Sequence, residues 1–412
     1  MTLTVHSPGL VLTEYEFEVP VDHAAPNGER ITVFAREVAD PDGRDRPFLV
    51  FFQGGPGQEA PRPTRGPSSP GWLDRALQDY RVLMLDQRGT GRSSPVGVLR
   101  GLTPQLQADR LALFRADAIV NDAEWIRREL GVDRWSVLGQ SFGGFCVLRY
   151  LSAAPSSLRE ALLTGGVPPV GRAVDDVYRA TFATMLQRNR HYYRRYPGDR
   201  DRVRTLLDLA GGGEIRLPSG TLTSRWLRQV GNALGMSDGA ERLHYLLERD
   251  PRSPAFAWDL SAMLPFTGRN PLYAVIHEAC YADGQSTGWS ADRVLPDAFR
   301  EDATLFTGEH VFPWNFDDDQ ALVPLRDAAH LLAARVWPRL YDPEGLGACD
   351  VPCAAAVYAN DAYVDRVFSE ETAAMIPTMR IWLTNEYEHN GLRADGARIL
   401  DRLIGLARGR LP

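Results

Sequence analysis

Cysteine is scarce in this chain, with four residues among 412. Four cysteines are too few for a disulfide framework in a chain of this length, and Cys146 and Cys280 lie in apolar stretches. Cys349 and Cys353 are close in sequence, but they have no cluster of cysteine and histidine residues around them that would form a metal site. We therefore expect reduced thiols and no bound metal.

Long hydrophobic runs are also missing. No apolar stretch approaches the roughly 20 residues that a membrane-spanning helix needs. The first residues, Met1 to Pro8, contain neither the basic nor the apolar segment of a secretory signal. From these absences we expect a cytoplasmic protein that has no membrane partner.

A surplus of basic residues is absent as well, because the formal net charge is −7. An acidic chain offers little attraction for nucleic acid. The basic run at residues 188–196 is followed closely by Asp199, Asp201 and Asp208, which favours a solvated helix face over a nucleic-acid surface. We expect no nucleic-acid partner. Because 44% of the residues are hydrophobic, the chain can bury a large core.

The chain does contain a serine motif in a specific context. Residues 135–140 have the pattern of a buried strand, the sequence Gly-Gln-Ser-Phe-Gly follows at 139–143, and an apolar helix start comes next. A strained turn from strand to helix exposes a serine hydroxyl as a nucleophile. Gly139 and Gly143 remove Cβ atoms that would collide in so tight a turn. Ser141 is therefore the candidate nucleophile, and an ordinary glycine-rich turn is the alternative.

The first part of the chain has the pattern of a layered α/β protein. Residues 10–19 and 29–38 are rich in β-forming residues and predict an antiparallel hairpin. Residues 47–52 and 81–86 are short, continuous apolar runs of the kind found in strands covered on both faces. Residues 116–130 have apolar side chains at helical spacing. This succession predicts a mainly parallel sheet with helices on both faces.

The middle of the chain has a different character. From about residue 170 to 345 the sequence is helix-like and rich in arginine, with breaks at glycine and proline. Strand patterns at 161–167 come before it, and those at 353–358 and 379–383 come after it, with a last amphipathic helix at 394–406. We expect a core formed by 1–169 and 346–412, into which a mostly helical cap domain, 170–345, is inserted.

Two loops near the C-terminus supply the partners that a serine nucleophile needs. The base is a histidine, which requires a carboxylate to fix its tautomer. Asp361 and His389 each follow a predicted strand, where functional groups of parallel sheets collect. With Ser141 they occur in the chain order of α/β-hydrolases. Asp365 is the rival for the acid, and Asp361 is preferred because it lies closer to the strand end.

Backbone amides near Ser141 are candidates for an oxyanion hole. The N–H of Phe142, the residue after the nucleophile, would supply one donor. The glycine-rich loop after the strand at 47–52 would supply the second, from Gly54 or Gly55. Attack by Ser141 and hydrolysis of the acyl-enzyme by water would need no cofactor.

Three segments together resemble the proline iminopeptidases, also called prolyl aminopeptidases. These are Gln53-Gly-Gly-Pro-Gly57, Asp86-Gln-Arg-Gly-Thr-Gly-Arg-Ser93 and Gly139-Gln-Ser-Phe-Gly-Gly144. The larger bacterial form is the closer match, and it has a C-terminal loop like residues 385–391. The resemblance implies an α/β-hydrolase with a helical cap that removes an N-terminal proline from peptides. The sequence departs from the smaller members of the family at Gln53, where they usually have histidine.

An enzyme of this family must recognise a charged N-terminal amine, and carboxylates in the cap meet that requirement. Glu278 and Glu309 each stand alone among apolar and aromatic residues, where an unpaired carboxylate is costly unless a cation binds. Tyr281, Phe312 and Trp314 would form the walls of a pocket for the pyrrolidine ring. The alternative is that both glutamates pair with arginines of the cap.

The leading hypothesis is a serine exopeptidase that releases N-terminal proline from short peptides through an acyl-enzyme. An aminopeptidase for other small or apolar N-terminal residues has the same chemistry. A carboxylesterase or lactonase would need no carboxylates in the cap, and a non-catalytic binding protein would be marked by a degenerate triad. The expected partners are small peptides with a free N-terminus, and no feature of the sequence indicates the oligomeric state.

Overall fold

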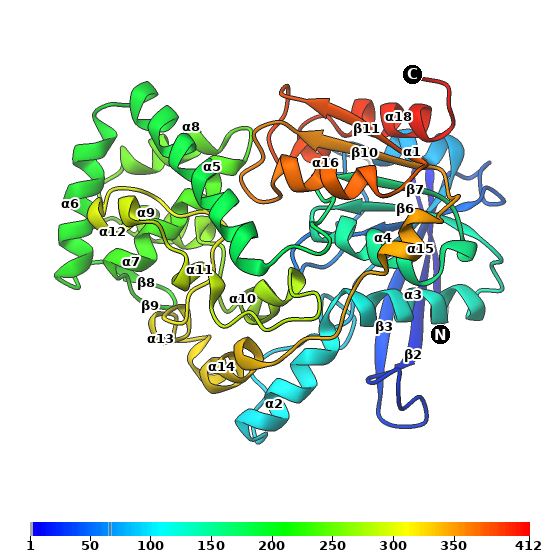
Figure 1. Cartoon of the computed structure of the whole chain (residues 1–412), viewed down its shortest axis with the longest axis horizontal. Helices are drawn as coiled ribbons and strands as arrows, with labels where there is room; N and C mark the ends of the chain where they lie inside the picture. Colours follow the sequence, from blue (N-terminus) through cyan, green and yellow to red (C-terminus); the bar gives the residue numbers. More distant parts are fainter. Residues whose placement is uncertain (1–2, 65, 67) are drawn as a thin grey trace.

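A nine-stranded sheet is the framework of the residues that the structure describes, and Figure 1 shows helices on both of its faces. The computed structural model describes residues 3–64, 66 and 68–412. The strand order across the sheet is β1-β2-β3-β5-β4-β6-β7-β10-β11. In chain order these strands are β1 (Leu3–Ser7), β2 (Leu10–Pro20), β3 (Arg30–Ala39), β4 (Phe48–Phe52), β5 (Arg81–Leu85), β6 (Trp135–Gln140), β7 (Leu158–Thr164), β10 (Cys353–Tyr358) and β11 (Met379–Thr384).

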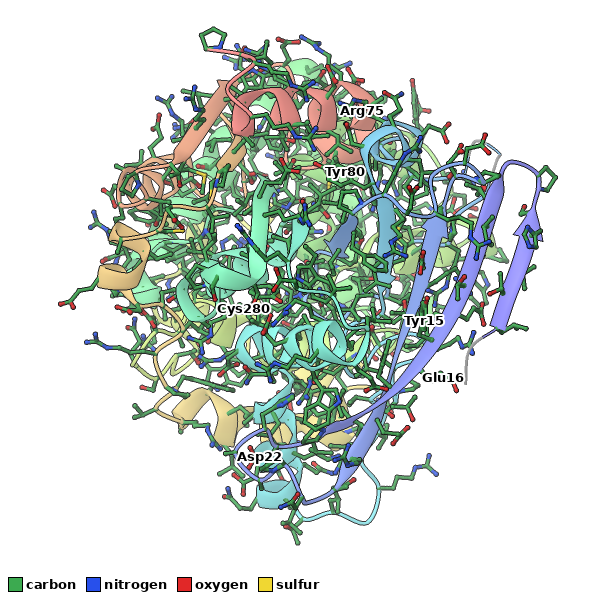
Figure 2. All side chains as sticks on the ribbon, turned by 90° about the vertical axis from the view of Figure 1, so that its right-hand side faces the viewer. Tyr15, Glu16, Asp22, Arg75, Tyr80 and Cys280 are labelled. Atoms are coloured by element: carbon green, nitrogen blue, oxygen red, sulfur yellow. The ribbon has the colours of Figure 1, made fainter. Side chains whose placement is uncertain are left out.

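Antiparallel pairing is confined to one side of this sheet. Strands β1, β2, β3 and β5 pair antiparallel in succession, and Figure 2 shows Tyr15 and Glu16 on β2, with Asp22 in the turn that follows. The pairs from β5 through β4, β6, β7 and β10 to β11 are all parallel. The mainly parallel sheet expected from the sequence is confirmed. The carboxyl ends of these parallel strands all lie at one edge of the sheet, where functional groups collect.

Alternate residues of the central strands face opposite sides of the sheet. In β4, Val50 and Phe52 belong to one hydrophobic cluster, which includes residues of α3 and α4. Leu49 and Phe51 belong to a second cluster, which includes residues of α1 and α18. Both faces are therefore covered, which is why continuous apolar runs form strands here. These covering helices are α1 (Leu73–Asp79), α3 (Ala116–Glu129), α4 (Phe142–Ala153) and α18 (Gly396–Ala407).

A long helical segment separates β7 from β10 in the chain, and Figure 1 shows most of its helices gathered beside the sheet. It also contains a two-stranded sheet of β8 (Arg216–Leu217) and β9 (Gly220–Thr221). Its helices are α5 (Val174–Arg195), α6 (Asp199–Gly211), α7 (Ser224–Leu227), α8 (Gly239–Leu247), α9 (Pro254–Met263), α10 (Pro271–Ile276), α11 (Ser290–Arg293), α12 (Asp297–Glu301), α13 (Asn315–Asp318), α14 (Arg326–Ala334) and α15 (Pro343–Gly347).

Some elements had no clear signal in the sequence. Strand β1 is exposed along most of its length, so it has no buried apolar pattern. In the core, three helices were also not predicted: α1, α2 (Pro104–Leu111) and α17 (Gly391–Ala394). Helix α16 (Arg366–Ala374) begins directly after Asp365. Strand β7 lies three residues earlier than predicted, at Leu158–Thr164 in place of 161–167. Apolar residues continue past its end, and periodicity alone does not mark where the strand stops.

A buried arginine joins the β2–β3 hairpin to the helices beneath it. Arg88 has only 1% of its surface exposed, and its Nε donates to Asp122 Oδ2 at 2.7 Å. Its guanidinium also donates to the carbonyl oxygens of Val21 and Leu113, both at 2.7 Å, and of Pro20 at 3.0 Å. Asp122 lies in α3, so one side chain links three segments that are far apart in the chain.

Replacing Asp122 by alanine should destabilise the protein by about 3 to 5 kcal/mol, because the Arg88 charge would stay buried without its partner. Urea unfolding of Asp122→Ala against the unchanged protein measures this difference. Asp201→Ala removes a largely exposed aspartate that pairs with Arg204, and it should cost less than about 1 kcal/mol. An Asp122→Ala protein that matches this control would show that the buried pair contributes little.

Candidate active site

Ser141 lies in a strained turn between β6 and α4. Its φ of 57° and ψ of −124° are unfavourable for a residue with a side chain, at a cost of roughly 1 to 3 kcal/mol. A Cβ at Gly139 would lie 2.3 Å from the carbonyl oxygen of Gly143, and a Cβ at Gly143 would lie 1.9 Å from that of Phe52. Both glycines are therefore required by close backbone contacts, as the motif predicted.

The structure brings the three predicted triad residues together. His389 Nε2 lies 2.8 Å from Ser141 Oγ, and His389 Nδ1 lies 2.8 Å from Asp361 Oδ2. An ionised carboxylate only accepts hydrogen bonds, so Nδ1 carries the proton and donates it to Asp361. Nε2 is then free to accept a hydrogen bond from the Ser141 hydroxyl. This arrangement can remove the serine proton during nucleophilic attack.

Asp361 is held in place by backbone donors. Its Oδ1 accepts from the N–H groups of Tyr363 at 2.9 Å and Val364 at 3.1 Å, which leaves Oδ2 for the histidine. The rival acid, Asp365, caps the first turn of α16, where it accepts from the N–H of Val367 at 2.9 Å. Asp365 is therefore committed to starting a helix, and the structure places Asp361 beside His389.

Opposing effects act on the pKa of His389. Burial is the largest effect and lowers it, because a buried imidazolium loses its hydration. The charge of Asp361, the hydrogen bond to that carboxylate and the charge of Glu309 favour the protonated ring. The net result is a pKa above the ordinary value of histidine. A base of this strength accepts a proton from serine readily near neutral pH.

Two backbone segments lie close to Ser141, the start of α4 and the loop after β4. Helix α4 begins at Phe142, so the N–H of Phe142 is among the first four of the helix, which have no acceptor within it. Gly54 packs directly on the nucleophile, since a Cβ there would lie 3.0 Å from Ser141 Cβ. Gly55 follows it and lines the same cavity as Ser141. These segments can donate to a negative charge that forms beside Ser141.

A cavity opens next to Ser141, and the space between its lining atoms, including space open to solvent, is about 230 Å³. Most of the side chains that line it are apolar or aromatic, and the exceptions include the acidic group of Glu309. Five of the lining residues come from the long helical segment or from the loop after β10. The full set is Gly55, Pro56, Ser141, Phe142, Phe145, His277, Cys280, Tyr281, Glu309 and Val364.

Glu309 is a partly exposed carboxylate that lines the cavity beside Ser141. Burial raises its pKa to about 7, although the nearby His389 and a hydrogen bond from Tyr273 lower it. The Tyr273 hydroxyl donates to Oε1. Among the described residues, no arginine forms an ion pair with Glu309 or with Glu278, so the alternative that cap arginines neutralise these two residues does not hold for that part of the chain.

Glu278 does not reach the cavity that Ser141 lines. It lines a second cavity with residues of α14, including Ala329 and Leu332. Its Oε1 accepts from the N–H of Ala291 at 2.9 Å, and burial raises its pKa to about 7. The sequence placed Glu278 and Glu309 in one pocket, whereas packing directs them into two. The two glutamates look alike in the sequence because each stands alone among apolar residues, so the sequence does not show that they line different cavities.

The predicted aromatic walls are also divided. Tyr281 lines the cavity beside Ser141. Phe312 and Trp314 are not among its lining residues, and their rings stack on each other with centroids 5.1 Å apart and planes at 12°. Phe145 in α4 lines the cavity instead, and its ring meets that of Tyr281 edge to face at 5.3 Å. Phe145 lies in the first turn of the helix that follows the serine motif, and this position could have indicated that it lines the cavity.

His277 was also missed, although it stands next to Glu278. It is 3% exposed and lines the cavity with Ser141 and Glu309. It precedes Tyr281 by four residues, the spacing that places two side chains on one helix face, and this spacing could have indicated it. No group of three or more histidine, cysteine or acidic residues suited to a metal was found in residues 3–64, 66 and 68–412.

Comparisons with known proteins identify the family of this chain. A family profile described as the alpha/beta hydrolase fold matches residues 47–204. A proline iminopeptidase of Aeromonas sobria is 47% identical in an alignment that covers 97% of this chain and 97% of that protein. The chain belongs to the proline iminopeptidase family. The resemblance and the α/β-hydrolase fold expected from the sequence are both confirmed.

Other proline iminopeptidases match to different extents. Proline iminopeptidase aneH of Aspergillus aculeatus is 33% identical, covering 98% of this chain and 95% of that protein. A probable proline iminopeptidase of Streptomyces coelicolor is 33% identical over 150 residues, covering 35% of this chain and 40% of that protein. None of the described helices combines the length and apolar character needed to cross a membrane.

The raised pKa of Glu278 predicts a pH-dependent effect on stability. The folded protein holds this proton up to about pH 7, whereas a glutamate with the ordinary pKa of 4.5 has already released it. Folding stability from this group is therefore lost as the pH rises from 4.5 towards 7. Glu278→Gln should raise the free energy of unfolding by about 1 to 3 kcal/mol at pH 8 and change it little at pH 4.

Urea unfolding at both pH values measures this effect. Glu301→Gln is the matched control, because it removes the same charge at an exposed position and should have no comparable pH-dependent effect. A Glu278→Gln protein that is less stable than the unchanged protein at pH 8 would contradict this prediction, because it would show that the buried carboxylate stabilises the fold.

Proposed function

We propose that this protein is a serine exopeptidase that releases N-terminal proline from short peptides through an acyl-enzyme. The observation that carries the proposal is the hydrogen-bonded row of Ser141, His389 and Asp361 at the edge of a cavity that also holds Glu309. The relatives that match over nearly the whole chain are named proline iminopeptidases, which supports the same substrate class.

In the proposed reaction, Ser141 is the nucleophile and His389 is the general base. His389 takes the serine proton as Oγ attacks the carbonyl carbon of the first residue, and it then gives this proton to the leaving amine. Asp361 keeps the imidazole in the correct tautomer and stabilises its charged form. Water, activated by the same histidine, then releases the first residue from Ser141.

The oxyanion of each tetrahedral intermediate would lie against backbone donors. The N–H of Phe142 is one of them, and Gly54 or Gly55 supplies the other. The close packing of Gly54 on Ser141 supports this assignment, because it keeps the loop backbone beside the reacting carbon. Each donor of this kind contributes roughly a hundredfold to a thousandfold in kcat.

Glu309 would bind the charged N-terminal amine of the substrate. A buried carboxylate without a cationic partner is unfavourable, as its raised pKa shows, and an ammonium group would stabilise its ionised form. Tyr281 and Phe145 supply apolar surface for a pyrrolidine ring in the same cavity. Glu278, Phe312 and Trp314 would instead support the surrounding structure.

The helical residues 170–345 would act as a cap on a core formed by 1–169 and 346–412. The support for this is the composition of the cavity, since Ser141 comes from the core, and His277, Tyr281 and Glu309 come from the helical part. A cap over the nucleophile leaves little room beyond the first residues of a peptide, which favours short substrates. A cytoplasmic location stays a prediction from the sequence.

Two alternatives use the same nucleophile. An aminopeptidase for other small or apolar N-terminal residues would also need an amine-binding carboxylate. A carboxylesterase or lactonase would not, so the position of Glu309 in the cavity disfavours it.

The first test compares kcat/KM for proline anilide, alanine anilide, N-acetylproline anilide and a butyrate ester. Proline anilide should lead, and acetylation should abolish turnover because it removes the charge that Glu309 binds. Ser141→Ala should lower kcat by at least about a thousandfold, and Ser156→Ala, at an exposed position, should leave it unchanged. If the ester is preferred and acetylation has no effect, the protein is an esterase.

The second test is the pH dependence of kcat/KM below neutrality. Proline anilide needs a neutral His389 and an ionised Glu309, whose pKa is about 7, whereas the ester needs only His389. As the pH falls, the logarithm of kcat/KM should decline with a slope approaching about 2 for the anilide and about 1 for the ester.

Glu309→Gln should reduce the anilide slope to that of the ester and lower kcat/KM for the anilide by about tenfold to a hundredfold. Glu278→Gln is the control, because it removes a glutamate with a similarly raised pKa from the other cavity. Equal effects of the two variants, or equal effects of Glu309→Gln on anilide and ester, would remove the amine-binding role from Glu309.

A further inference from the structure

The protonation of the His277 ring follows from its hydrogen bonding. His277 Nε2 lies 3.1 Å from the backbone carbonyl oxygen of Glu309. A carbonyl oxygen only accepts hydrogen bonds, so Nε2 carries the proton and donates it. Burial lowers the pKa of His277 to about 4, and the ring is therefore neutral near pH 7. Nδ1 is left with a lone pair, as an acceptor.

This acceptor has no partner in the part of the chain that the structure describes. Nδ1 of His277 is buried and forms no hydrogen bond there. Two tyrosine rings lie close, with centroids 5.5 Å away for Tyr273 and 6.0 Å away for Tyr281. Both hydroxyls are engaged elsewhere, since Tyr273 donates to the Glu309 carboxylate and Tyr281 donates to the carbonyl of Tyr363. A buried acceptor without a donor is unfavourable and calls for an explanation.

His277 lines the same cavity as Ser141 and Glu309. A donor that enters this cavity could therefore satisfy both the free ring nitrogen and the glutamate. Among the described residues, only Oε1 of the Glu309 carboxylate has a hydrogen-bond donor, which leaves Oε2 open. Two residues that line the cavity, from two positions of the helical segment, thus each carry an acceptor without a donor, one charged and one neutral.

We propose that Nδ1 of His277 accepts a hydrogen bond from the N-terminal ammonium group of the substrate, beside the Glu309 carboxylate, and thereby favours a secondary ammonium. The inference rests on the proposed peptidase function. A prolinium group has two N–H donors, which match the two acceptors. A primary ammonium has three, so one would need a further partner. His277 is therefore assigned as a specificity-determining residue.

The test uses two ligands and binding calorimetry in the Ser141→Ala background, where nothing is turned over. Prolinamide has two N–H donors on its ring ammonium, and N-methylprolinamide has one. His277→Gln keeps a donor that can reach the Glu309 carbonyl but removes the acceptor at the Nδ1 position. His277→Asn is the matched variant, because its amide oxygen can occupy the Nδ1 position.

Prolinamide should bind the Ser141→Ala protein at least about tenfold more tightly than N-methylprolinamide, since a hydrogen bond to a charged donor is lost with the methyl group. In Ser141→Ala/His277→Gln, prolinamide affinity should fall by about tenfold or more, and the preference over the methylated ligand should shrink to less than about threefold. His277→Asn should restore part of that preference. If the methyl group weakened binding only through a steric clash, the preference for prolinamide over N-methylprolinamide would be the same in every variant.

Equal binding of the two ligands to the Ser141→Ala protein overturns the inference without any change at His277, and so does an undiminished preference in the glutamine variant. The proposed function is judged separately, by turnover of proline anilide with Ser141 intact. Turnover together with an unchanged ligand preference would overturn only the role of His277. Failure of prolinamide to bind any variant, together with absence of turnover, would overturn both.

Discussion

The parallel register of four neighbouring strands is the constraint on which the catalytic geometry depends. Ser141 follows β6, Asp361 follows β10 and His389 follows β11, with β7 between β6 and β10. Their side chains meet at 2.8 Å, whereas a slip of one residue moves a strand by about 3.3 Å and turns its side chains to the other face. A buried hydrogen bond between Thr164 and Tyr358, 2.6 Å long, joins β7 to β10 at the edge that carries the triad.

The second constraint is electrostatic. Burial keeps Glu309 only partly ionised near neutral pH, because its pKa is about 7. A cationic ligand would favour the ionised form and reduce the free-energy cost of a carboxylate in an apolar cavity. The charge of Glu309 also acts on His389, since Glu309 is one of the groups that raise the pKa of the His389 ring. An amine at Glu309 would therefore also weaken the tendency of His389 to hold a proton, and the neutral base would be favoured when substrate is bound.

The strands of the core and the positions of the three triad candidates could be located from the sequence because each has a local signal. Continuous apolar runs mark strands with both faces buried, and the serine motif requires a strand before it and a helix after it. The cap residues have no such signal. Glu278 and Glu309 look equivalent in the sequence, and the packing of Ala291 and of helix α14 around Glu278 separates them. Packing between distant segments leaves no periodic pattern in the sequence. The hydrogen bonding of the His277 ring depends on the same packing, so the sequence did not indicate its free acceptor.

The helical segment also positions the triad loops, as the basic run at 188–196 shows. Arg188 was expected on a solvated helix face, but it is largely buried and donates to Glu388 at 2.8 Å and to the carbonyl oxygen of Asn360 at 2.5 Å. These acceptors directly precede His389 and Asp361. The N–H of His389 donates to the carbonyl of Gly235, another residue of the helical segment, at 3.2 Å. These contacts tie the loops that carry Asp361 and His389 to the helical segment, so a shift of that segment that broke them would displace both side chains.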